Sequence, residues 1–99
     1  AGIGGAAAAA VGDRLSRLAE DVQVLVVTHS PQVAARGNTH FQISKSGSDV
    51  GNITQVGELT GDVRTEEIAR MLSGEKITKE ARAAAVSLLD ASERVEAAQ

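Results

Sequence analysis

His29 is the residue of this chain best placed to do chemistry, because it follows an unbroken apolar run over residues 24–27 and one threonine. Such a run is typical of a strand that is buried on both faces of a parallel sheet covered by helices. We therefore expect a buried strand over residues 22–28. Ligands in these sheets bind beyond the carboxyl ends of the strands, so the sequence predicts that His29 lies where α/β proteins hold their ligands.

Three interpretations of His29 stay open from the residues alone. Its imidazole can contact a phosphate or polarise a water, because histidine titrates near neutral pH and donates hydrogen bonds. It can also bind a metal, but no second histidine, cysteine or acid stands at ligand spacing, and His40 lies on a different predicted strand. In the third interpretation His29 only caps the helix that begins at Pro31. No metal site is predicted.

Glycines at the start of the chain form the second candidate feature. The segment Gly2-Ile3-Gly4-Gly5-Ala6-Ala7 formally matches the dinucleotide-binding fingerprint G-x-G-x-x-A. That fingerprint requires a strand before the glycines and an acidic residue at the end of the next strand. This chain has no strand before them, and its next predicted strand ends in threonine and histidine. The other interpretation is a turn that leads into a helix.

The elements that position these residues follow from hydrophobic spacing and capping signals. Apolar residues recur at helical spacing over residues 6–20. In that helix we expect Gly12 to permit close packing on a sheet, and Asp13 to pair with Arg17 one turn later. A serine suited to capping and a proline at the first helical position predict a short helix over 31–36, after the buried strand.

The second half of the chain predicts a hairpin and two helices. Residues 39–45 alternate, which places Phe41 and Ile43 on one half-buried face, and a polar loop over 46–52 leads to a partner strand over 53–59. A break at Gly61-Asp62 then precedes a helix over 65–72, which ends at Gly74. Its inward side chains are Ile68, Met71 and Leu72, and Glu66 and Glu67 lie on a solvated face. Thr78 caps a last helix over 79–96, whose apolar face is Ala81, Ala85, Leu88 and Leu89. The predicted order is helix, buried strand, short helix, β-hairpin and two C-terminal helices, which is an α/β fold.

Composition limits the classes of protein that fit. The chain has 99 residues, a formal net charge of -3, no cysteine and Phe41 as its one aromatic residue. Its length suits one domain with a small core. Without cysteine the chain has no disulfide or thiolate chemistry, and it has no basic stripe that would bind nucleic acid. No apolar stretch is long enough for a membrane span. Because it begins with Ala1 in a glycine turn, we expect that an upstream part is missing.

Two stretches of the chain resemble the C-terminal part of the ATPase head of RecN, a bacterial DNA repair family related to the SMC proteins. The first stretch is T-H-S-P-Q-V-A-A over residues 28–35, preceded by the glycine turn and the first helix. The second is E-E-I-A-R-M-L-S-G over residues 66–74. The resemblance covers most of the chain, and residues 46–60 are its least distinctive part.

The resemblance implies a role for each candidate residue. Gly2, Gly4 and Gly5 would belong to the D-loop, which packs across a nucleotide-bound dimer of heads and needs close backbone approach. His29 would be the switch histidine that reaches the γ-phosphate of ATP. The Walker A lysine, the signature motif and the Walker B acids of the family have no counterpart in this chain, so the 1–99 segment would be a C-terminal fragment of a P-loop ABC/SMC-type head.

The same resemblance implies the wider biology. The intact parent would bind ATP and Mg²⁺, and would couple ATP hydrolysis to DNA double-strand-break repair and recombination in the bacterial cytoplasm, at the nucleoid. This chain would be inactive alone. Its partners would be the missing N-terminal part of the same head, a second head in an ATP-dependent homodimer, and DNA. The alternatives are a head fragment of another ABC- or SMC-type ATPase, or a small non-enzymatic α/β interaction domain.

Overall fold

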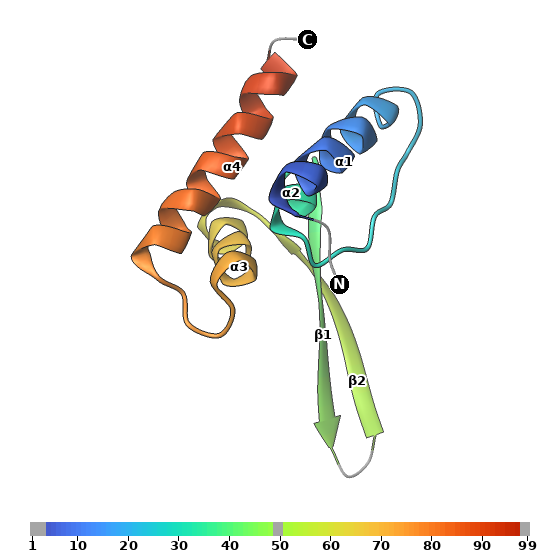
Figure 1. Cartoon of the computed structure of the whole chain (residues 1–99). Helices are drawn as coiled ribbons and strands as arrows, with labels where there is room; N and C mark the ends of the chain where they lie inside the picture. Colours follow the sequence, from blue (N-terminus) through green and yellow to red (C-terminus); the bar gives the residue numbers. More distant parts are fainter. Residues whose placement is uncertain (1–3, 49–50, 98–99) are drawn as a thin grey trace.

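A computed structural model describes residues 4–48 and 51–97 as four helices and one β-hairpin (Figure 1). Their order along the chain is α1 (Gly5–Leu18), α2 (Pro31–Ala34), β1 (His40–Ser48), β2 (Gly51–Leu59), α3 (Gly61–Ser73) and α4 (Lys79–Ala97). The two strands are antiparallel, and their register runs from the pair His40–Leu59 to the pair Ser48–Gly51. The hairpin extends away from the helices (Figure 1).

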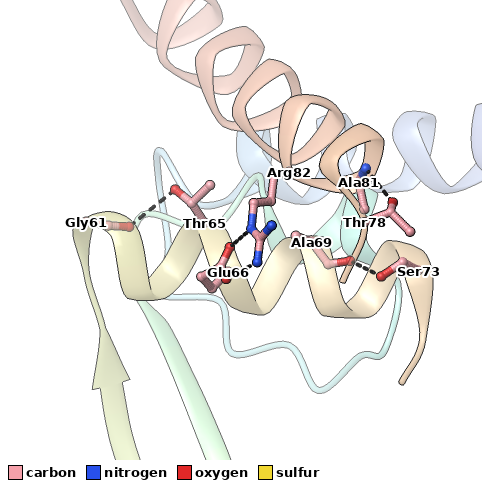
Figure 2. A network of polar contacts seen from close by, with 8 residues as sticks. All are labelled: Gly61, Thr65, Glu66, Ala69, Ser73, Thr78, Ala81 and Arg82. Carbon is pink, nitrogen blue, oxygen red and sulfur yellow. Dashed lines mark hydrogen bonds and ion pairs between the residues drawn. The ribbon is translucent and has the colours of Figure 1, made fainter. Parts of the chain in front are cut away.

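Three helix ends lie where the capping residues of the sequence predict them, whereas α2 ends at Ala34, before the predicted Arg36. The Ser30 hydroxyl accepts the Val33 amide at 3.4 Å and so caps α2. Gly74 follows α3 with a φ of 83°, a conformation that glycine adopts at little cost. The Thr78 hydroxyl accepts the Ala81 amide at 3.0 Å, which caps the start of α4 (Figure 2). These signals are local, so their prediction did not depend on the rest of the fold.

The core lies between α3 and α4. Ile68 and Ala69 of α3 pack against Ala81 and Ala85 of α4, and Ala35 closes one end. Half-buried side chains surround this cluster: Ala34, Met71, Leu72, Ile77, Leu88 and Leu89. The predicted inward faces of both helices are therefore confirmed. Because most of these side chains are small, the core gains little apolar area per residue.

An ion pair joins α3 and α4 on the surface of this core (Figure 2). The Arg82 guanidinium donates to both carboxylate oxygens of Glu66, at 2.9 and 3.2 Å. These hydrogen bonds lower the pKa of Glu66 and raise that of Arg82. Both side chains are about half exposed, so the pair adds little to stability.

The predicted buried strand over residues 22–28 is wrong for this chain. Residues 23–30 form irregular structure, and the side chains of Leu25 and Val27 are each 86% exposed, while Val24 is half-buried. A strand buried on both faces needs neighbouring strands and covering helices. Within the described part of the chain the only sheet is the hairpin, and this segment is not paired with it.

The hairpin is confirmed, but its predicted half-burial is wrong. Phe41 is 52% exposed, Ile43 is 59% exposed, and Val56, opposite Ile43, is 64% exposed. The opposite face, which carries Gln42, contacts α3. The predicted loop over 46–52 is also too long, since most of its residues pair in β1 and β2.

Helix α3 begins earlier than predicted. It starts at Gly61, so the expected Gly61-Asp62 break is wrong. Asp62 lies in the first turn, where a carboxylate interacts favourably with the helix dipole. The overall result is a mixed α and β structure with one antiparallel hairpin.

Candidate functional site

His29 lies in a short turn immediately before α2. Its side chain is exposed. On its N-terminal side, the Thr28 hydroxyl accepts the Ser30 amide at 2.9 Å. On its C-terminal side, the Ser30 hydroxyl caps α2 and lies 3.2 Å from Gln32 Oε1. We call residues 28–30 the His29 turn. These bonds define the backbone on both sides of an imidazole that faces solvent.

The N-terminal glycines approach α2. Gly2 lies outside the described residues, whereas Gly4 and Gly5 are described and exposed, with Gly4 as the N-cap of α1. A Cβ atom added to Gly5 would lie 3.6 Å from Gln32 Nε2. The start of α1 therefore lies beside the helix that follows the His29 turn. The role of these glycines at a dimer interface stays a prediction.

Helix α1 packs closely on α2 at Gly12. A Cβ atom added there would lie 2.9 Å from Arg36 Cγ and 3.3 Å from the Gln32 carbonyl oxygen. Gly12 thus permits a close approach, but to a helix rather than to the sheet that the sequence led us to expect. The Asp13 carboxylate binds Arg17 at 3.2 Å, as predicted, and also Arg36 at 3.3 Å, a contact that sequence spacing did not reveal.

Arg64 holds the other side of α2. Its Nη2 atom lies 3.1 Å from the carbonyl oxygen of Ala34, 3.4 Å from that of Ala35 and 2.7 Å from that of Gly37. Ala34 is the last residue of α2 and Ala35 is its C-cap, so the guanidinium lies at the C-terminal end of the helix, where the partial charge is negative and a cation is favoured. Sequence spacing does not predict this contact of Arg64, because its acceptors lie 27–30 residues earlier in the chain.

Glu67, one turn after Arg64, is the one charged residue among the buried residues described, at 9% exposed. Arg70 donates to its carboxylate from Nε at 2.7 Å, and Gln42 of β1 also donates to it. The prediction that Glu67 belongs to a solvated face is therefore wrong. Its hydrogen bond with Arg70 raises the pKa of that arginine.

His40 lies close to this acid at the start of β1. Burial lowers the pKa of His40 below its usual 6.5, the Arg64 charge lowers it further, and the Glu67 charge opposes both. Its Nδ1 atom is buried without a hydrogen-bond partner. The second histidine therefore belongs to the contact between the hairpin and α3, and it is not brought to the His29 turn by any described contact.

Neither a metal centre nor a membrane helix is found in the described part of the chain. No three acidic, histidine or cysteine side chains of residues 4–48 and 51–97 come together as metal ligands. None of the helices in these residues is long and apolar enough to cross a membrane.

Comparison with known proteins identifies the relatives of this sequence. No protein-family model matches the chain. RecN of Deinococcus radiodurans, described as a DNA repair protein, is 60% identical over 74 residues, which are 75% of this chain and 13% of the relative. The RecN proteins of Xylella fastidiosa (strain Temecula1) and Mycobacterium leprae are 53% and 46% identical over 89% and 94% of the chain, and over 16% of each relative. The resemblance to RecN is thus confirmed: over 75% or more of its length, this chain is homologous to a segment of that DNA repair protein.

Proposed function

We propose that the chain acts as the C-terminal part of a RecN-like ATPase head in DNA double-strand-break repair and recombination. The support is the identity of 46–60% to three proteins named as DNA repair proteins. The chain spans only 13–16% of the length of these relatives. ATP and Mg²⁺ would then be held by other residues of the intact protein, outside this 99-residue chain, in a P-loop head of ABC/SMC type.

The observation that carries this proposal is the exposed apolar segment over residues 22–28. Leu25 and Val27 are each 86% exposed, and Val22 and Val26 are 51% and 41% exposed. Burying one such side chain stabilises a protein by about 1.5–3 kcal/mol, so leaving these four apolar side chains in water is unfavourable. We propose that the remainder of the head covers this segment.

Within that head, the His29 turn supplies the imidazole. An exposed histidine next to a capped helix can donate a hydrogen bond to the γ-phosphate or to the attacking water. Gly4 and Gly5, beside α2, would contact a second head when two heads bind ATP between them. DNA would be bound by the intact protein, in the bacterial cytoplasm at the nucleoid.

A chimera tests the proposal. In this RecN chimera, the segment of the Deinococcus radiodurans protein that matches the chain is replaced by the chain. We expect the RecN chimera to hydrolyse ATP and to restore survival after double-strand breaks to cells that lack RecN, while the 99-residue chain does neither. A chimera that folds but lacks both activities would contradict the proposed function.

A paired substitution tests the covered segment. Changing Leu25 and Val27 to Asp should destroy ATP hydrolysis by the RecN chimera, because two charges would be buried against the rest of the head. The matched control is Val63→Asp, which changes a valine that is 63% exposed in the first turn of α3. Equal activity of the paired variant and the control would show that the segment stays exposed.

A further inference from the structure

We propose that Arg64 is a positioning residue, which fixes α2 and the His29 turn from helix α3. The proposal rests on the function proposed above for His29. It adds a residue that lies outside that turn and that donates to backbone carbonyls at the end of the helix that follows it. The inference follows from four observations on α2, Arg64, the His29 turn and α1.

Helix α2 cannot hold its own conformation. It has four residues, and isolated helices of fewer than about 12 residues are marginal in water. Its internal bonds are those of a single turn, from the Ala34 amide to the Ser30 carbonyl and from the Ala35 amide to the Pro31 carbonyl, both at 2.9 Å. Two further bonds close the end of the helix, from the Arg36 amide to the Val33 carbonyl at 3.1 Å and from the Gly37 amide to the Ala34 carbonyl at 3.2 Å. So short a helix depends on contacts with other elements to keep its place.

Arg64 provides such a contact from a distant part of the chain. The same nitrogen, Nη2, lies within hydrogen-bond distance of three carbonyl oxygens at and just after the end of α2, with the shortest distance, 2.7 Å, to Gly37. A guanidinium suits this role because it is planar, keeps its charge at all physiological pH values and presents several fixed donors. A lysine ammonium would keep the charge but lose the fixed geometry.

Two local hydrogen bonds connect α2 with the backbone at His29. The Ser30 hydroxyl accepts the Val33 amide, and the Thr28 hydroxyl accepts the Ser30 amide. His29 lies between these two bonded residues. A shift of α2 therefore moves the backbone that carries the imidazole, and a displacement of about 1 Å at a reacting group can cost a hundredfold in rate.

Helix α1 contacts the other side of α2, so α2 lies between α1 and Arg64. Gly12 lets α1 approach the Gln32 backbone, and Asp13 binds Arg36 just after α2. Removal of Arg64 would leave this α1 contact in place, so α2 should remain attached but become mobile at its C-terminal end. We therefore expect an effect on the reaction step rather than on nucleotide binding.

The test compares single and double variants of the RecN chimera. Arg64→Ala should lower kcat for ATP hydrolysis about tenfold, with KM for ATP changed less than about twofold. Arg64→Lys should lie between this variant and the unmodified chimera. The matched control is Arg82→Ala, which removes an arginine that binds the exposed Glu66 and should change kcat less than about twofold.

The decisive comparison is the double variant. If Arg64 acts through His29, the variant that carries both Arg64→Ala and His29→Ala should be no slower than His29→Ala alone. Losses that multiply in the double variant would overturn the proposal, as would an Arg64→Ala chimera with full kcat. Should Arg64→Ala fail to fold, Arg64→Lys, which keeps charge and bulk, carries the same comparison.

The design also separates the two proposals. If the chimera that carries His29→Ala hydrolyses ATP at the full rate, the proposed role of His29 is wrong, and so is the positioning role of Arg64. If the His29→Ala variant is slow and the Arg64→Ala variant is not, only the positioning role of Arg64 is wrong. Hydrogen exchange at the Ala34 and Ala35 amides should rise in the Arg64 variants but not in Arg82→Ala, which gives a readout that does not depend on activity.

Discussion

At the scale of single residues, the two histidines of the chain have different environments. His29 is exposed beside the N-terminus of α2, whereas His40 is partly buried between β1 and α3, with Arg64 and Glu67 facing it. An exposed imidazole can meet a ligand without any rearrangement of the core. The partly buried one contributes to the contact between the hairpin and the helix.

Substitution of His29 should slow the reaction without weakening the fold. A hydrogen bond from its imidazole to a charged phosphate is worth about 1.5–3 kcal/mol. If that stabilisation is realised mainly in the transition state, His29→Ala slows ATP hydrolysis by the RecN chimera by roughly ten- to a hundredfold. Nucleotide affinity and the melting temperature should change little. An unchanged rate together with a large loss of melting temperature would favour a structural role.

His40 predicts how stability depends on pH. Because burial and Arg64 hold its pKa below the usual 6.5 while Glu67 only partly compensates, the unfolded chain binds more protons than the folded chain in this range. The stabilisation is fully present above about pH 6.5 and is lost as the pH falls through the pKa of the folded state. Urea unfolding of the chain at about pH 7.5 and about pH 5.5 should show this loss. His40→Gln should reduce the difference, and the control His29→Gln should not.

At the scale of elements, capping residues and helical periodicity were predicted correctly at several places from local signals. The caps at Ser30, Gly74 and Thr78 lie where they were predicted, because each is a hydrogen bond or backbone conformation within a few residues. The inward faces of α3 and α4 were also predicted, since helical periodicity identifies them. These features do not depend on which other elements surround them.

The elements that were predicted wrongly depend on neighbours. An apolar run over 22–28 indicates burial, but burial needs covering elements, and the described part of the chain contributes none there. The apolar face of the hairpin, with Phe41 and Ile43, is exposed for the same reason. In the candidate site, the sequence identified His29. The contact of Arg64 was missed, because a side chain that binds backbone carbonyls 27–30 residues away leaves no pattern in the sequence.

The close contact between α1 and α2 predicts the effect of filling Gly12. Gly12→Val should destabilise the chain by about 1–3 kcal/mol, because the new side chain would press on Arg36 and on the Gln32 carbonyl group. The control is Ala9→Val, which adds the same side chain to an exposed position of α1. Urea unfolding of both variants measures the difference. Equal stability of the two would show that α1 can move away from α2 without cost.

At the scale of the whole molecule, the chain should not bind ATP by itself. Phosphate groups are held by a glycine-rich loop with a lysine and by Mg²⁺ ligands, and the sequence contains no G-x-x-x-x-G-K-[ST] motif. Calorimetric titration of the 99-residue chain with ATP and Mg²⁺ should give no heat above background. Micromolar binding would mean that these residues form a nucleotide site of another kind.

The contact of Arg64 with α2 also sets an order of events during protein synthesis. The carbonyls of Ala34, Ala35 and Gly37 leave the ribosome well before the guanidinium that binds them. Helix α2 is too short to persist alone, and until the first turns of α3 are made it has its contacts with α1 but not the Arg64 contact. The His29 turn is therefore completed late in translation, and a nascent chain that stops before residue 64 carries the histidine without the support that holds it in place.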